Sequence, residues 1–213
     1  LLCAALVACM QLAMSPPGGL RADDWPLGRG DVAGTGATAQ SLPADMELLW
    51  ELKVDGLGFD AGPIIADGKV FAADQDGHIL AIDLAGGEVL WRVDLETGFV
   101  VSPAYRDGWL FVGDYDGTLH ALDATNGQER WSYATEMEID GNPNFFEGNV
   151  LFTSQNGNLY CVKIDDGSLV WKYETGDQLQ CGPTLAGNKT FLGGCDSNLH
   201  VIDVNSGQRV GDL

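Results

Sequence analysis

The chain has 213 residues, and 45% of them are hydrophobic, which is enough to bury a sizeable core. It carries 31 acidic residues against 11 basic ones, which gives a formal net charge of −20. Such a surface repels nucleic acid and anionic lipid, and the basic residues form no cluster along the chain. We therefore expect no nucleic-acid partner.

The chain begins with an apolar run of about 14 residues, which is too short for a comfortable membrane-spanning helix. Pro16-Pro17-Gly18-Gly19 breaks this run, a pattern typical of the hydrophobic and cleavage regions of a secretory signal. We expect residues 1–22 to be a signal peptide that lacks its start and is cleaved after Ala22. Alternatively, Leu6–Cys9 is a lipobox, and Cys9 carries a lipid. The mature protein is then periplasmic or secreted, and a lipidated Cys9 would anchor it to the outer membrane.

Residues 23–48 form a lead-in to a part of the chain that repeats at a step of forty residues. Helical periodicity of useful length is missing after residue 45, and two positions recur strictly: a proline before the first apolar run and a glycine near the end of each unit. They are Pro63, Pro103, Pro143 and Pro183, and Gly87, Gly127, Gly167 and Gly207.

Each unit has the signals of four short strands joined by tight turns. Runs rich in β-branched and aromatic residues alternate with Asp-Gly or Asn-Gly pairs, for example Asp76-Gly77 and Asn156-Gly157, which favour hairpins. The first strand follows the proline, and the last strand carries a tryptophan. Four-stranded units at this spacing predict an all-β propeller of antiparallel blades, with about four blades in residues 49–213.

The recurring residues resemble the tryptophan-docking motif of the pyrroloquinoline-quinone (PQQ) repeat propellers, in which Ala, Asp, Gly and Trp stand at fixed spacing. The matching residues are Ala81, Gly87 and Trp91, then Ala121, Gly127 and Trp131, then Gly167 and Trp171. The resemblance implies that each tryptophan lies on the outer strand of a blade and stacks on the backbone of the next blade, where glycine permits close approach. The fourth copy has Gly211 in place of the tryptophan.

The same resemblance implies a ring of seven or eight blades. We therefore expect residues 49–213 to be a fragment of a larger ring, truncated at its C-terminus. The strand around Trp50 precedes the first whole unit and should complete the final blade of the ring.

PQQ enzymes of this family need a quinone pocket on the propeller axis, a bound calcium, an aspartate base and usually two adjacent cysteines. The chain has no adjacent cysteine pair and no acidic set that we can assign to a metal, so we expect no catalytic, PQQ-binding or calcium-binding residues. Asp74–Gly77 and Asp114–Gly117 resemble the start of a calcium loop, but strand residues follow them, and we interpret both as hairpin turns.

Other polar residues have structural interpretations as well. His120 and His200 share a slot with Leu80 and Tyr160, which indicates packing rather than catalysis. Asp60 and Asp140 share a slot near the expected channel, where they could attract a cation or a basic partner, but we expect them to be solvated. The Arg29–Asp31 tripeptide belongs to the lead-in rather than to an adhesion motif. Cys181 and Cys195 flank a hairpin turn and could form a disulfide, which would leave Cys161 reduced.

These observations favour a non-catalytic propeller that holds a protein partner, similar to the BamB-type outer-membrane assembly lipoproteins and related secreted bacterial propellers. The alternative is a fragment of a PQQ-dependent quinoprotein dehydrogenase whose active site lies in other blades.

Overall fold

The computed structural model describes residues 24–39, 41 and 44–212. The expected signal peptide, with Cys9, lies outside these residues. Every regular element of the described chain is a β-strand, and the strands form four antiparallel sheets. Within the same residues no helix is long and apolar enough to cross a membrane.

Each sheet contains four strands in sequence order, and the expected propeller fold with four blades is confirmed. Blade 1 consists of β1 (Ile64–Ala66), β2 (Lys69–Ala73), β3 (His78–Asp83) and β4 (Val89–Asp94). Blade 2 consists of β5 (Ala104–Arg106), β6 (Trp109–Gly113), β7 (Thr118–Asp123) and β8 (Glu129–Ala134). Blade 3 consists of β9 (Asn144–Phe146), β10 (Asn149–Ser154), β11 (Asn158–Lys163) and β12 (Leu169–Glu174). Blade 4 consists of β13 (Thr184–Ala186), β14 (Lys189–Gly193), β15 (Leu199–Asp203) and β16 (Gln208–Asp212).

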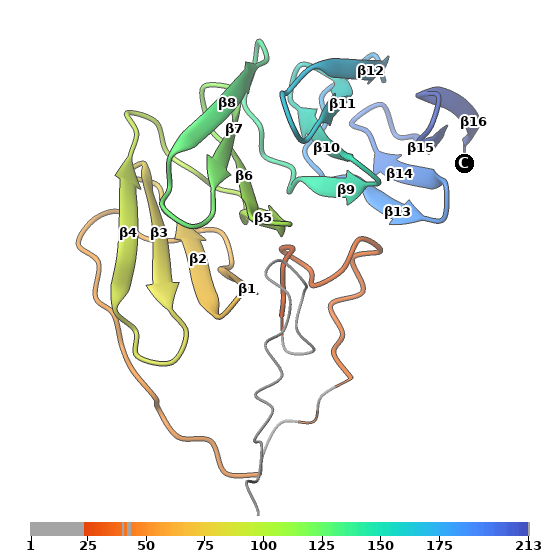
Figure 1. The fold of residues 1–213 in the computed structure, drawn as a ribbon. Coiled ribbons are helices and arrows are strands. Elements are labelled where there is room, and N and C mark those ends of the chain that lie inside the picture. The colour runs from red at the N-terminus through yellow and green to blue at the C-terminus, as the bar shows by residue number, and fades with distance from the viewer. Residues whose placement is uncertain (1–23, 40, 42–43, 213) are drawn as a thin grey trace, which may run out of the picture.

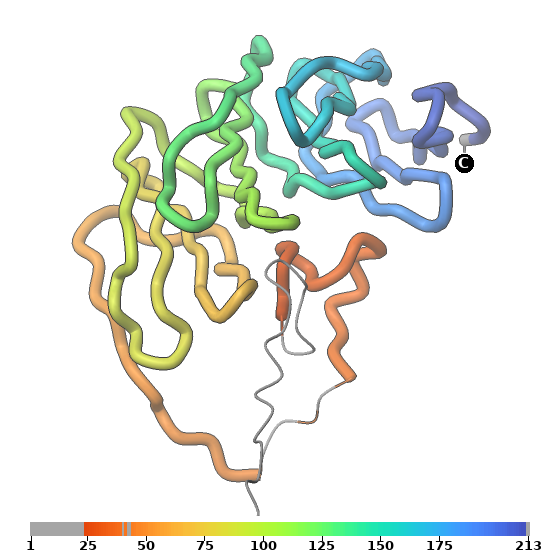
Figure 2. Tube along the Cα trace, in the orientation of Figure 1, coloured from red at the N-terminus to blue at the C-terminus, as the bar shows by residue number. Residues whose placement is uncertain are grey.

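The blades follow one another along an arc, and the short strands β1, β5, β9 and β13 lie on its concave side (Figure 1). The trace in Figure 2 shows the lead-in, in red, beside these inner strands. We call this concave side the axial side.

The Gly of the central hairpin brings two loops together in addition to making a turn. Gly77 has a φ of 94°, and a Cβ there would lie 2.2 Å from the carbonyl oxygen of Leu95. The Leu95 amide in turn donates to the Gly77 oxygen at 2.9 Å. The same arrangement recurs at Gly117 and Gly157. The repeated glycine therefore holds the hairpin against the loop that leaves the outer strand.

The core lies between blades rather than within them. One cluster joins Phe71 and Ile79 of blade 1 to Tyr105 and Leu110 of blade 2. The rings of Phe71 and Tyr105 stack with their centroids 5.9 Å apart. Phe71, Phe111 and Phe152 are fully buried. Truncating a ring of this kind to alanine costs about 3–5 kcal/mol, so the layers between the sheets contribute strongly to stability.

The repeated tryptophans link each blade to the next. The Nε1 atoms of Trp91, Trp131 and Trp171 donate to the carbonyl oxygens of Ala124, Ile164 and Val204 at 3.2, 2.8 and 2.9 Å. A Cβ at Gly127, Gly167 or Gly207 would lie 2.6–2.7 Å from the indole of the tryptophan that packs on it. Glycine is thus required sterically at these positions, as well as by their positive φ.

The small residue of the motif lies opposite the tryptophan within the same blade. Ala81 pairs with Trp91 across β3 and β4, and Ala121 pairs with Trp131 across β7 and β8. Cys161 takes this place opposite Trp171 and is buried. A small side chain here lets the indole lie flat toward the neighbouring blade.

Trp50 makes the same kind of contact from outside the four sheets. Its Nε1 donates to the Leu84 oxygen at 2.9 Å, and its ring lies against Gly87. Trp50, Leu52 and Val54 also pack on Val70, Leu80 and Ile82, on the face of blade 1 that points away from blade 2. The structure assigns no strand between residues 44 and 63.

Candidate functional site

Residues 24–36 of the lead-in run along the axial side, and we call them the axial strap. Trp25 and Ile65 of β1 exchange both backbone hydrogen bonds, at 2.7 and 2.9 Å. The amide of Tyr105 in β5 donates to the Pro26 oxygen at 2.8 Å, and that of Leu185 in β13 donates to the Val32 oxygen at 2.9 Å. Residues 65, 105 and 185 occupy one position of the repeat, so the strap accepts the same N–H group from three blades.

In blade 3, a side chain of the blade itself takes the place of the strap carbonyl as hydrogen-bond acceptor. At the equivalent position, the amide of Phe145 donates to Oδ1 of Asn144 at 2.8 Å. The Nδ2 of Asn144 then donates to the oxygens of Val32 and Pro183, both at 2.8 Å. Asn144 is buried and thereby joins the strap, blade 3 and blade 4. Sequence reasoning missed this residue, although it is a polar amide in the slot that holds Ile64 and Ala104 in blades 1 and 2.

The strap is folded into tight turns of its own. The amides of Gly30, Gly34 and Gly36 donate to the oxygens of Leu27, Asp31 and Arg29 at 2.8, 2.9 and 3.0 Å. Gly30 has a φ of 84°, and a Cβ there would lie 3.1 Å from the Trp25 indole. The turns therefore depend on glycine and leave the backbone little freedom.

Asp31 closes the second of these turns. Its Oδ1 accepts the Thr35 amide at 3.1 Å, and its Oδ2 accepts the Thr35 hydroxyl. These hydrogen bonds, the hydroxyl one above all, lower the pKa of the Asp31 carboxyl. The aspartate of the Arg-Gly-Asp tripeptide thus stabilises the strap, and the sequence-based interpretation of this tripeptide as part of the lead-in agrees with the geometry.

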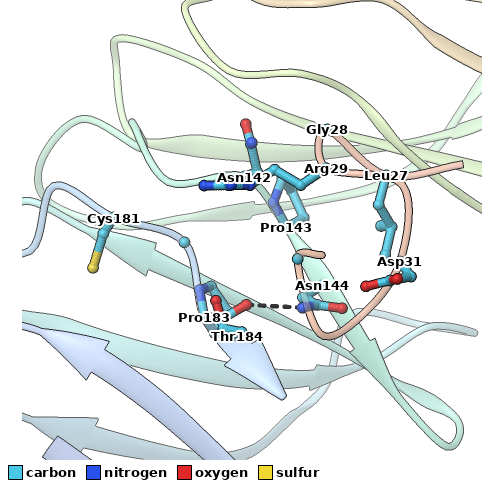
Figure 3. A pocket seen from close by; sticks show the side chains of 12 residues that line it. Leu27, Gly28, Arg29, Asp31, Asn142, Pro143, Asn144, Cys181, Pro183 and Thr184 are labelled. Atoms are coloured by element: carbon cyan, nitrogen blue, oxygen red, sulfur yellow. Dashed lines mark hydrogen bonds between the residues drawn. The ribbon is translucent and has the colours of Figure 1, made fainter. Parts of the chain in front are cut away.

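A cavity of about 240 Å³, the axial pocket, lies between the strap and the segments that lead into blades 3 and 4 (Figure 3). Arg29 and Asp31 line it from the strap, Asn142 and Asn144 from blade 3, and Thr184 from blade 4. The strap fits closely on one wall, because a Cβ at Gly28 would lie 2.5 Å from Nδ2 of Asn142. The pocket is therefore polar, and its shape depends on the strap.

The histidines lie away from this pocket, on the third strands of blades 1, 2 and 4. His120 is buried between two carboxylates: Nε2 lies 2.9 Å from Oδ2 of Asp114, and Nδ1 lies 2.7 Å from Oε2 of Glu129. Burial by itself lowers the pKa of His120, but the hydrogen bonds to Asp114 and Glu129 outweigh it and raise the pKa. His120 thus links two carboxylates in a buried place and forms ion pairs with them when it is protonated, which the interpretation of its slot did not foresee.

The aspartates that resemble calcium-loop residues are engaged in their turns. Oδ1 of Asp74 accepts the amides of Asp76 and His78 at 3.0 and 2.9 Å, and its Oδ2 lies 2.7 Å from Nδ1 of His78. Asp114 accepts the Thr118 amide in the same way. These contacts agree with the hairpin-turn interpretation.

Asp140 is more enclosed than expected. Gln155 donates one amide nitrogen to Oδ2 of Asp140 and to Oε2 of Glu138, each at 3.0 Å. Burial raises the pKa of both carboxyls, and for Glu138 the nearby Asp140 adds to the effect. Across residues 24–39, 41 and 44–212, no three His, Cys, Asp or Glu side chains are grouped to hold a metal ion.

The three described cysteines are free thiols, so the suggested disulfide between Cys181 and Cys195 is not formed. The Cys181 thiol instead donates to the Gly193 oxygen at 3.2 Å, near the end of β14. Cys161 is buried against blade 4, and burial raises the pKa of its thiol to about 12. A thiol with that pKa stays protonated and unreactive.

Comparison with known proteins shows which family the chain resembles. A family model described as outer membrane protein assembly factor BamB, a model of PQQ repeats, matches residues 35–141 and 134–211. No curated protein matches the chain significantly.

Solved structures share the fold at low sequence identity. BamB from Moraxella catarrhalis is 18% identical, with a TM-score of 0.59 over 68% of this chain and 49% of its own. Quinohemoprotein alcohol dehydrogenase from Comamonas testosteroni is 19% identical, with a TM-score of 0.76 over 89% of this chain and 41% of its own. The computationally designed Ika8 protein is 18% identical, with a TM-score of 0.65 over 73% of this chain and 51% of its own.

The chain thus spans about half, or less, of the length of these structures. At such identities the likeness shows the fold alone. The family model, in contrast, matches most of the sequence, and with it the repeat motif and the four blades. The protein therefore belongs to the PQQ-repeat propeller family of outer membrane protein assembly factor BamB.

Proposed function

We propose that the protein is a non-catalytic propeller that holds a protein partner, in the manner of a BamB-like scaffold in the bacterial envelope. The observation that carries this proposal is the axial strap. It lies along the inner strands, where a PQQ enzyme of this family needs its cofactor pocket, and it uses inner-strand N–H groups of blades 1, 2 and 4.

The polar residues of the axial side also support this proposal. Asn144 and Asp31 are engaged in hydrogen bonds that hold the strap in place. Among the described residues, no three His, Cys, Asp or Glu side chains are grouped to hold a metal ion, and the neighbouring carboxylates of Glu138 and Asp140 share a Gln155 amide. The described residues thus offer no grouped ligands for the calcium ion that a dehydrogenase of this family needs, which supports the non-catalytic proposal.

Family membership also supports a location for the protein. A protein related to an outer membrane protein assembly factor would work in the periplasm or outside the cell. We propose that the mature protein is secreted to this compartment, and that a lipid on Cys9 would hold it at the outer membrane. Its partner would be a protein, since the net charge of −20 disfavours nucleic acid.

A quinoprotein dehydrogenase is the second candidate, because the quinohemoprotein alcohol dehydrogenase fold covers 89% of this chain. In that case the residues that bind PQQ would lie in blades other than these four. The natural full-length protein, purified from its own envelope, separates the two candidates.

The full-length protein would be titrated with PQQ and Ca²⁺ by calorimetry and assayed for PQQ-dependent reduction of a dye by alcohols. We expect neither binding nor dye reduction. We also expect a protein in stoichiometric amount to co-purify with it after mild cross-linking. Saturable PQQ binding with alcohol-dependent dye reduction would establish the dehydrogenase, and a lone protein after cross-linking would contradict the scaffold.

A further inference from the structure

We propose that the axial pocket binds a carboxylate group, with the Arg29 guanidinium and the Asn142 amide as its donors. The inference deepens the proposed function and rests on it in one respect: it takes the carboxylate to be the C-terminus of a protein partner. A small carboxylic acid offers the same chemistry, and the experiment below separates the two sources.

Arg29 is a cation that the described chain leaves without a carboxylate partner. Three other arginines form ion pairs with nearby aspartates: Arg92 with Asp94, Arg106 with Asp107 and Arg130 with Asp123. The carboxylate closest to Arg29 in sequence, Asp31, is occupied by Thr35. Among the described cations, Lys163, Lys172 and Lys189 also form no ion pair, but Arg29 is the one that lines the axial pocket. In a molecule with a net charge of −20, this makes the pocket a site for an external anion.

Asn142 supplies a second donor in a known orientation. Its Oδ1 accepts the Ser102 amide at 2.9 Å, so its Nδ2 is the end that remains to donate. This Nδ2 lies against Gly28, the residue before Arg29, and Asn142 and Arg29 both line the axial pocket (Figure 3). A planar guanidinium and an amide N–H₂ group are both donors to a carboxylate. The Asp31 carboxylate also lines the pocket, but its two oxygens accept hydrogen bonds from Thr35.

The backbone that carries Arg29 is held in place before any ligand arrives. The Arg29 oxygen accepts the Gly36 amide at 3.0 Å, and the preceding turn is closed between Leu27 and Gly30 at 2.8 Å. The stem of Arg29 passes over Gly34, where a Cβ would lie 3.8 Å from its Cδ. A preorganised cation loses less entropy on binding than one on a free loop.

The size of the pocket and the negative charge of the protein favour a ligand with a single carboxylate. A cavity of about 240 Å³ corresponds to on the order of eight water volumes, which admits a carboxylate and the residue that bears it. Nucleic acid and other polyanions would be repelled by the surrounding negative charge. One guanidinium can neutralise one carboxylate, and the Thr184 hydroxyl on the blade 4 wall can orient it.

The test uses the ¹⁵N-labelled chain and follows the NMR signals of the Arg29 Nε–H and the Asn142 side-chain amide. The probes are N-acetyl-trialanine with a free C-terminus, the same peptide as its C-terminal amide, and acetate. We expect the free acid to shift both signals saturably and the amide to leave them unchanged. Arg29→Gln should weaken binding about tenfold or more, because a charge-assisted pair is lost. Arg92→Gln, the matched control on β4, should bind as the wild type does.

If acetate binds as tightly as the peptide acid, the site recognises the carboxylate alone, and small acids are its ligands. If the peptide acid binds more tightly, a chain terminus is the ligand. Equal shifts with the peptide amide, or full binding by Arg29→Gln, would overturn the proposal. Such a failure leaves the cross-linking result untouched, so the loss of this site and the loss of the scaffold function are told apart.

Discussion

The outer side and the axial side of the propeller use the repeat in opposite ways. On the outer side, Trp50, Trp91, Trp131 and Trp171 make the same hydrogen bond to a carbonyl 33 or 34 residues further on. On the axial side, the four equivalent amides at residues 65, 105, 145 and 185 bond to Trp25, Pro26, Asn144 and Val32. A contact made between neighbouring repeats can be copied with the repeat. A contact with a single strap must differ from blade to blade, and this side therefore carries the features specific to this protein.

Removing a docking tryptophan should have the largest effect on stability. Trp131→Ala deletes the indole that covers Gly167 and loses the bond to the Ile164 oxygen. We expect the free energy of unfolding to fall by about 3 kcal/mol, at the low end for a large aromatic because the ring is half-buried. Urea denaturation measures it, with exposed Lys172→Ala as the control. If the loss were smaller than that of Asn144→Ala, the axial contacts would contribute more to stability than the tryptophans, contrary to our ranking.

Removing Asn144, whose side chain takes the place of a strap carbonyl in blade 3, should have the next largest effect on stability. Asn144→Ala leaves the Phe145 amide and the Pro183 oxygen without their partner in a buried place, while the Val32 oxygen keeps the bond from the Leu185 amide. We expect a loss of about 2 kcal/mol, since unpaired buried polar groups keep their desolvation cost.

Hydrogen exchange locates the effect of this variant. The Tyr105 and Leu185 amides, which bond directly to the strap, should exchange faster in Asn144→Ala, whereas the Trp131 indole N–H should not. Unchanged exchange at Tyr105 and Leu185 would mean that the strap does not depend on Asn144.

His120 should make the stability of blade 2 depend on pH. Its pKa is raised in the folded state by Asp114 and Glu129, against the opposing effect of burial. The stabilisation is therefore fully present below the unfolded pKa of about 6.5 and is lost as pH rises through the higher folded pKa. The difference in urea midpoint between wild type and His120→Gln should shrink as pH rises above about 6.5. A difference that is constant from pH 5 to 9 would show that folding does not shift the pKa of His120, and would contradict this prediction.

The smallest effect should come from within the strap. Thr35→Val removes the hydroxyl bond that contributes most to the low pKa of Asp31, so that pKa should rise toward its ordinary value. Asp31 is exposed, and the change in global stability should be close to zero because solvent screens the interaction. NMR titration of the Asp31 carboxyl measures the shift, and an unchanged pKa would place its cause in the turn amides instead.

The fold could be predicted because its signals are local and periodic. The forty-residue register, the Asp-Gly turns and the spacing of Gly87 and Trp91 each reflect the steric needs of one blade and its neighbour. The hairpin interpretation of Asp74–Gly77 held for the same reason, since the carboxylate bonds within its own turn. The suggested pairing of Cys181 with Cys195 did not appear, because side-chain direction across a short hairpin is decided by packing that a register count does not contain.

The candidate site could be predicted only in its parts. The lead-in was recognised as a segment of its own, but nothing in its residues indicates that it lies along four inner strands. Asn144 and Arg29 are each an isolated polar residue in the sequence, and their roles arise from contacts with residues that are far away along the chain, such as Pro183 for Asn144. His120 likewise depends on Glu129, which belongs to the adjacent strand.

The sequence by itself determined the blade: four strands, their turns, and a tryptophan that must find a glycine one repeat ahead. These follow from backbone sterics and hydrophobic alternation, which act over a few residues and recur with the repeat. The tertiary structure alone decided what occupies the axial side. The inner-strand N–H groups on that side need acceptors, and most of these acceptors are carbonyl oxygens of the axial strap. The strap contacts the blades in the folded protein but is not part of the repeat.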